Sequence, residues 1–150
     1  MYEELLREHI EDKTSYGERP QAPCDDTSLA TLRDRARREL GLELPDAYVS
    51  FLRVTNGLDS NGLTVYAAET SSIVGHEDMS IEGIVDANLG WWDFAPHRAF
   101  LYFAESGISL YAVEIRTGRF LVIDRQSHSD MEEVASFEAL MARALEASHP

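Results

Sequence analysis

The sequence has a single cysteine, few basic residues and no long apolar run, and each of these scarcities excludes a class of protein. One cysteine cannot cross-link the chain or build a thiolate metal site, and Cys24 has no basic neighbour that would favour a reactive thiolate. No stretch approaches the roughly 20 apolar residues that cross a bilayer. Residues 1–12 are rich in Glu and Arg and lack the apolar centre of a secretory signal. We therefore expect a cytoplasmic protein.

Positive charge is also scarce, because 13 Lys and Arg stand against 27 Asp and Glu, for a formal net charge of −14. A field of this sign repels nucleic acid and anionic lipid, so neither is expected as a partner. It accelerates encounter with a basic protein, although the need for solubility explains acidity equally well. The basic cluster of the chain reads as one solvated helix face: Arg33, Arg35, Arg37 and Arg38.

A length of 150 residues and an apolar fraction of 44% are typical of one folded domain with its own core. Residues 1–12 predict a short helix, and residues 14–26 predict an irregular linker, so that 1–26 form an N-terminal extension. Apolar residues at helical spacing predict a second helix that Asp26 or Thr27 caps and Gly41 ends. Pro45 suits the first turn of a third helix, which Asn56-Gly57 terminates. Ser136 can cap a last helix, with Phe137 on its buried side.

Three β-rich runs at 99–104, 108–115 and 119–124 are separated by the short turns Ser106-Gly107 and Thr117-Gly118. Turns this short require antiparallel neighbours. A further strand is expected at 63–67. The pattern predicts an α+β fold in which helices pack on one face of an antiparallel meander. The segment 68–98 can be either helical or irregular from its sequence.

The search for chemistry finds no catalytic, cofactor or metal site. The histidines are scattered without an i, i+4 pair, which is against a metal centre. Ser106 lies in a hairpin turn rather than in a nucleophile elbow, and no glycine-rich phosphate loop occurs. Paired carboxylates carry no signal in so acidic a chain. We expect no enzyme activity and no cofactor.

The aromatic pair Trp91-Trp92 is the best candidate for a binding surface, since tryptophan is enriched at binding hot spots. Adjacent tryptophans in an extended chain would point in opposite directions, so one of them is expected to be exposed, unless both pack beneath the 68–98 segment. Acidic residues close in sequence could form a rim that attracts a basic partner. The predicted protein-binding residues are Glu69, Glu77, Asp78, Trp91, Trp92 and Asp93.

The stretch 42–57 resembles the entry motif of the SUKH superfamily, the Smi/Knr-like proteins. In that family a helix is followed by a leucine-proline step, and a second helix carries an aromatic-leucine pair and ends in Asn-Gly. The order of later elements is also similar, so the resemblance covers most of residues 27–145. The matching residues are Leu44, Pro45, Tyr48, Phe51, Leu52, Asn56 and Gly57.

The resemblance implies a SUKH-like α+β fold and, for bacterial members, an immunity protein that binds and neutralises a cognate toxin, often a nuclease. The matched residues imply the fold and carry no binding site with them. The expected partner is a basic toxin domain, because a nuclease must be basic to hold its substrate. The alternatives are a regulatory or scaffold module of the Smi/Knr type and, third, a small-molecule-binding or hydrolytic domain with a pocket near His76, His97 or His128.

Overall fold

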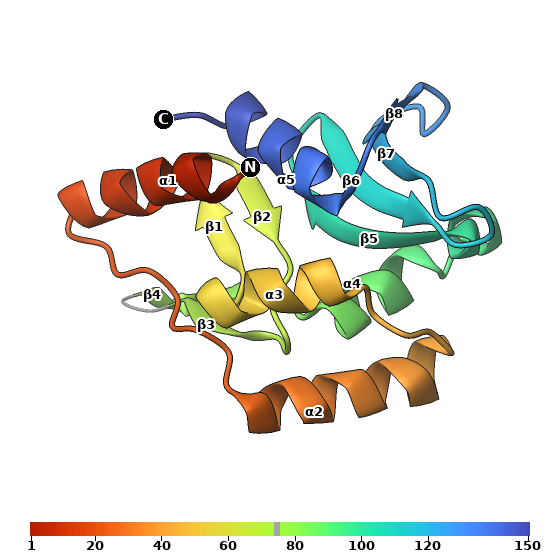
Figure 1. The fold of residues 1–150 in the computed structure, drawn as a ribbon, viewed down its shortest axis with the longest axis horizontal. Coiled ribbons are helices and arrows are strands. Elements are labelled where there is room, and N and C mark those ends of the chain that lie inside the picture. Colours follow the sequence, from red (N-terminus) through yellow and green to blue (C-terminus); the bar gives the residue numbers. More distant parts are fainter. Residues whose placement is uncertain (74–75) are drawn as a thin grey trace.

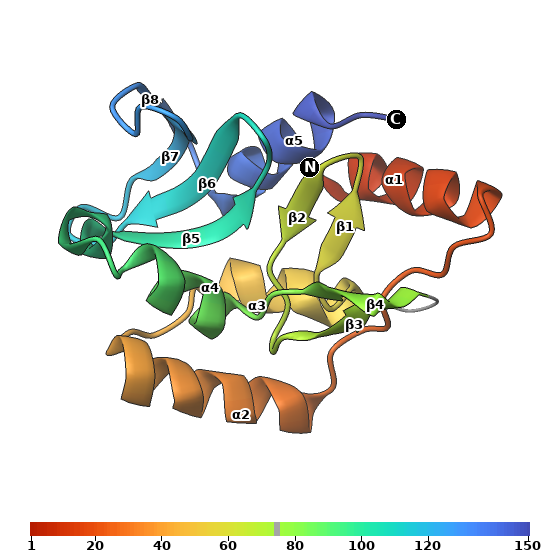
Figure 2. The same cartoon turned by 180° about the vertical axis from the view of Figure 1, so that it is seen from behind.

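The computed structural model describes residues 1–73 and 76–150, with the backbone alone at 76 and 77. The fold is α+β, as predicted from the sequence. Figures 1 and 2 show α1 and α5 beside each other near the two termini, and α2 on the opposite side of the molecule, with α3 and α4 between. The helices are α1 (Glu3–Ser15), α2 (Asp26–Arg35), α3 (Asp46–Val54), α4 (Ile84–Trp91) and α5 (Phe137–Ala147), with a π-helical turn η1 (Ala36–Leu40) and a 3-10 helix η2 (Ala95–Ala99).

The helix ends follow local sequence signals. The Asp25 carboxylate accepts a hydrogen bond from the backbone N–H of Ser28 at 2.8 Å, so the cap of α2 lies one residue before the predicted candidates. Gly41 ends the helical stretch in the left-handed conformation, at φ 69°. Ser136 caps α5 as predicted, with its hydroxyl 3.1 Å from the backbone nitrogen of Ala139. Among the described residues, no helix combines the length and apolarity needed to cross a membrane.

The main sheet is antiparallel throughout, in the order β1-β2-β5-β6-β7-β8. The predicted meander is its centre, and two further strands were missed at its edges. The strands of this sheet are β1 (Leu58–Ser60), β2 (Leu63–Val65), β5 (Phe100–Glu105), β6 (Ser109–Glu114), β7 (Phe120–Asp124) and β8 (Met131–Val134).

The segment 68–98, which the sequence left open, is neither one helix nor irregular. It contains a two-stranded antiparallel sheet of β3 (Ser71–Ile73) and β4 (His76–Ile81), then α4 and η2. Gly83 joins the small sheet to α4 where two backbones cross closely. A Cβ atom on Gly83 would lie 2.6 Å from the Cα of Glu69, so only glycine fits this crossing.

The strand β5 is buried on both sides. On one side Phe103 packs against the rings of Tyr48 in α3 and Phe137 in α5, with ring centroids 5.4 and 5.1 Å away. Tyr102 contacts a separate set of rings on the other side, and its ring centroid is 5.5 Å from that of Trp91. The predicted helical layer therefore covers one face, and an aromatic cluster covers part of the other.

The N-terminal helix is packed into the main core through Tyr2 and Leu6. Between α1, β1 and α5 lies His9, which is fully buried. Its Nδ1 is 2.7 Å from the Ser60 hydroxyl, and its Nε2 is 2.8 Å from the carbonyl oxygen of Leu145. One imidazole thus connects three elements, and both of its nitrogens have partners.

Candidate protein-binding surface

The predicted binding residues do not form one surface. Asp78 is exposed on β4, and the side chain of Glu77 lies outside the described residues. Glu69 lines a pocket against α2, whereas Trp91, Trp92 and Asp93 follow one another at the far end of α4. The structure therefore keeps the tryptophans with Asp93 and separates them from Glu69.

The two tryptophans are at the end of a helix, and the prediction that they lie in an extended chain is wrong. Both are half-buried rather than one buried and one exposed. The Trp91 indole N–H donates to the Tyr66 hydroxyl at 3.0 Å, and the Trp92 indole N–H donates to the carbonyl oxygen of Phe100 at 2.8 Å. These two bonds fix the rings and leave part of each apolar surface open to a partner.

Trp91 belongs to a cluster of aromatic and imidazole rings that sequence analysis did not connect. The rings of His97 and His128 stack with centroids 4.2 Å apart, although the residues come from η2 and from the loop after β7. The Tyr102 hydroxyl is 2.8 Å from the Nε2 of His128. Phe94 contacts His97 edge-on and is 60% exposed, so the cluster presents an aromatic edge to solvent.

His128 is held in this cluster by an unusual backbone. Its φ of 55° is left-handed, a conformation that residues other than glycine seldom adopt. Its N–H donates to the carbonyl oxygen of Asp124 at 2.8 Å and so closes the loop. Burial, and next the neighbouring His97, lower the pKa of His128. The structure therefore favours a neutral imidazole in the stack.

A shallow depression of about 350 Å³ adjoins Trp91. Arg125 occupies one side of it, with its guanidinium carbon 5.5 Å from the centroid of the Trp91 ring. The same guanidinium is 2.7 Å from the Glu105 carboxylate and donates to the carbonyl oxygen of Ser106 at 2.8 Å. A cation thus lies between an indole and a carboxylate. The depression is lined by Glu82, Ala87, Gly90, Trp91, Glu105 and Arg125.

Glu82 differs from Glu105 in this depression because no cation pairs with it within the described part of the chain. Partial burial of its carboxyl group, followed by the charges of Glu105 and Asp86, raises the pKa of Glu82. Asp86 is paired with Arg35 at 2.6 Å. Of these carboxylates, Glu82 is therefore the one that still lacks a cation.

Sequence reasoning missed Glu105 and Arg125, but strand order contained a signal for them. The strands β5 and β7 both pair antiparallel with β6, so they run parallel to each other. Their C-terminal ends therefore lie at the same end of the sheet. Glu105 ends β5, and Arg125 comes directly after β7. The predicted meander therefore already implied that these opposite charges meet.

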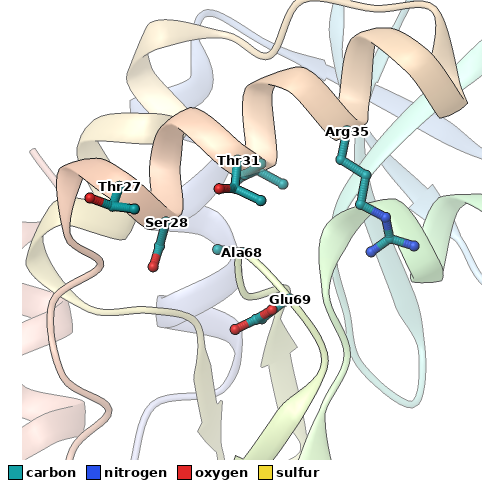
Figure 3. Close-up of a pocket in the computed structure, with 7 residues that line it drawn as sticks. Thr27, Ser28, Thr31, Arg35, Ala68 and Glu69 are labelled. Carbon is teal, nitrogen blue, oxygen red and sulfur yellow. The ribbon is translucent and has the colours of Figure 1, made fainter.

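A second pocket, of about 230 Å³, lies between α2 and the chain at Ala68-Glu69 (Figure 3). The hydroxyl-bearing residues Thr27, Ser28 and Thr31 come from the same helix as Arg35, and Glu69 extends beneath them from the other wall. The guanidinium of Arg35 is already paired with Glu39 and Asp86, so it does not offer a free positive charge there.

The arginines of α2 and η1 are each paired with a carboxylate of this chain, which supports their interpretation as a solvated face. The pairing also neutralises the basic cluster that could otherwise attract nucleic acid. The pairs are Arg33 with Asp46, Arg35 with Glu39 and Asp86, Arg37 with Glu43, and Arg38 with Asp34.

Cys24 is buried, although it precedes α2 in an irregular segment. Burial, and next the charge of Asp25, raise the pKa of its thiol, which disfavours the reactive thiolate. Among the described residues, no three His, Cys, Asp or Glu side chains are grouped so that they could hold a metal ion.

A scan against protein-family models finds no match to the chain, and a search of curated proteins finds no significant match.

Proposed function

We propose that this chain is a non-catalytic protein-binding domain, and specifically an immunity protein that binds and neutralises a basic toxin. The observation that carries the proposal is the partly open aromatic cluster around Trp91, Phe94 and His97, with the carboxylates of Glu82 and Glu105 beside it. Aromatic anchors next to carboxylates are what a basic protein surface would require.

The distribution of charge supports a basic partner. Most of the cations of this chain are paired with its own carboxylates, while the net charge is −14. The excess acidic side chains are therefore those without an internal cation. Such a surface increases the rate of encounter with a positively charged protein at low salt.

The SUKH resemblance supports the proposal of an immunity protein. Its matched residues include core aromatics and residues of the turn after α3. Tyr48 and Phe51 are fully buried in α3. The side-chain oxygen of Asn56 accepts a hydrogen bond from the backbone N–H of Ala68 at 2.8 Å, and Gly57 is left-handed at φ 84°. These residues hold the turn after α3 and leave partner recognition to other surfaces.

The test is capture of partners by the tagged full chain from its own cells, followed by elution with a salt gradient. We expect a stoichiometric basic protein that salt releases, and whose toxic activity, nuclease activity included, the purified chain suppresses. Phe94→Ser should weaken capture, because Phe94 is exposed and its removal leaves the core intact. Tyr16→Ser is the control, since Tyr16 is also an exposed aromatic residue, at 80% against 60% for Phe94, and directly follows α1 outside the aromatic cluster.

Capture of endogenous cellular proteins alone, from cells that also make a toxin, would contradict the immunity proposal and favour a regulatory or scaffold module. Equal capture by Phe94→Ser and Tyr16→Ser would show that the aromatic cluster is not the binding surface. A copurifying metabolite without any protein partner would favour the small-molecule alternative instead.

A further inference from the structure

The depression beside Trp91 has the composition of a receptor for a single cationic side chain. Among the described residues, its walls carry two carboxylates, Glu82 and Glu105, and one cation, Arg125. Arg125 and Glu105 form an ion pair at 2.7 Å and neutralise each other. The Glu82 carboxylate then has no cation in the described lining to balance its charge. A second cation would complete the charge balance of the depression.

The contacts of Arg125 show that the lining of the depression can bind a guanidinium group. The Arg125 guanidinium lies over the indole of Trp91 and pairs with a carboxylate, the arrangement in which arginine is bound by aromatic and acidic groups. The Tyr66 hydroxyl, which accepts the Trp91 indole N–H, fixes the ring in that position. The indole is therefore pre-organised rather than free to rotate.

The shape of the depression favours a side chain from a partner over a small free ligand. It is shallow, at about 350 Å³, and its lining includes the small residues Ala87 and Gly90 of α4. Apart from its two chain neighbours and the backbone of α4 itself, no described atom lies within 4 Å of the position that a Cβ atom on Gly90 would occupy. The absent side chain thus leaves space open directly beside Trp91.

The geometry points to this depression as the site where an arginine side chain of the basic partner binds, with its guanidinium paired with Glu82 and its stem against Gly90 and Trp91. Arginine suits the site better than lysine, because its planar guanidinium donates two parallel hydrogen bonds to one carboxylate and stacks on aromatic rings. The identity of the protein that carries this arginine rests on the proposed function, whereas the site itself does not.

The site is tested separately from the partner, with Nα-acetyl-arginine amide as the probe and the 15N-labelled full chain observed by NMR. We expect saturable shifts of the Trp91 indole N–H and of the Gly90 amide. The indole N–H of Trp92 is the internal control, because Trp92 borders a different depression with Leu89 and Arg98. Nα-acetyl-citrulline amide, which has the same shape without the charge, should bind at least about tenfold more weakly.

Three variants locate the binding. Gly90→Leu should abolish the shifts by filling the depression, and its fold is protected because the position is open and leucine favours a helix. Glu82→Gln should weaken binding about fivefold or more by removing the unpaired charge. Glu69→Gln is the matched control, since it removes a carboxylate from the pocket against α2 and should change nothing.

Arg125→Gln should bind the probe more tightly than the natural chain, because it frees the indole face and the Glu105 carboxylate. Shifts that persist in Gly90→Leu, equal shifts with the citrulline derivative, or no shift at Trp91 would overturn the inference. A toxin that binds the natural chain and Gly90→Leu equally would remove the arginine site and leave the proposed function standing. Probe binding at Trp91 without any captured protein partner would support the arginine site and contradict the proposed function.

Discussion

The side chain of Asn88 forms a pair of hydrogen bonds with the backbone of Tyr102, as a neighbouring strand would. Its Oδ1 accepts from the Tyr102 N–H at 2.8 Å, and its Nδ2 donates to the Tyr102 carbonyl oxygen at 2.9 Å. The strand β2 pairs with β5 only at Glu105 and Ala104, so Tyr102 lies beyond the end of that ladder. Asn88, which is fully buried, therefore continues the sheet from a helix and anchors the end of α4 that carries the tryptophans.

Asn88→Ala should destabilise the protein by about 2–4 kcal/mol, because it leaves the Tyr102 N–H and carbonyl without partners in a buried site. Urea unfolding followed by circular dichroism measures the change. Gln126→Ala, which removes an exposed side-chain amide from the loop after β7, is a control for the loss of an amide. A loss in Asn88→Ala no larger than that of a surface substitution would show that water replaces the amide at Tyr102.

Two glycines of α4, the N-cap Gly83 and Gly90 in its last turn, should respond in opposite ways to alanine. Gly83→Ala should cost about 2–4 kcal/mol, because the new Cβ would overlap the backbone of Glu69 and Thr70. Gly90→Ala should be neutral or stabilise by up to about 1 kcal/mol, because it lies in open space in a helix. Thermal unfolding of both variants gives the comparison. Equal effects would mean that the close crossing at Gly83 is relieved by a small backbone shift.

His128 should make stability depend on pH in a defined direction. Its folded-state pKa is lowered, so protons bind the unfolded chain first as pH falls below the ordinary value of 6.5. The contribution of the neutral imidazole is thus complete above pH 6.5 and is lost as pH falls toward the lowered pKa. His128→Asn should lose this part of the pH dependence, because asparagine tolerates the left-handed backbone and does not titrate.

Urea unfolding at a series of pH values between about 7.5 and 5 would measure this difference between the natural chain and His128→Asn. His149 provides a contrast, because its hydrogen bond to Glu8 and then that to Pro150 raise its pKa. Its contribution is therefore present at low pH and lost as pH rises. Identical pH profiles for the natural chain and His128→Asn would contradict the role given to the imidazole stack.

Cys24 should react slowly with iodoacetamide in the folded protein and quickly after unfolding in urea. The expected protection follows from its 6% exposure and from the raised pKa of its thiol. Mass spectrometry of the alkylated chain over time measures both rates. Similar rates in the two states would show that the segment before α2 opens readily.

Much of the fold was predictable because its signals are local. The three central strands of the meander, the cap at Ser136 and the stop at Gly41 each follow from a few adjacent residues. The hairpin at Asn61-Gly62 was missed although its signal was equally local, since both residues are left-handed, at φ 50° and 82°. Recognition of that pair would have predicted β1.

The candidate site was less predictable, because contacts between distant segments build it. The stacking of His97 on His128 depends on which loops meet at one end of the sheet, whereas the predicted meander implied the pairing of Glu105 with Arg125. The edge strand β8 was missed for a different reason. Its sequence, Met131-Glu-Glu-Val134, is exposed and charged, and Glu132 and Glu133 bind Arg143 and Arg119 rather than contributing to a core.

The position of His9 has a consequence for the order in which the protein can be completed during synthesis. Its acceptor in α5, the carbonyl oxygen of Leu145, is 136 residues further along the chain. While the ribosome is still translating, α1 emerges with an imidazole and an apolar side that have no α5 to pack against. Because α1 is translated before α5, it can dock in its final position only after α5 has left the exit tunnel.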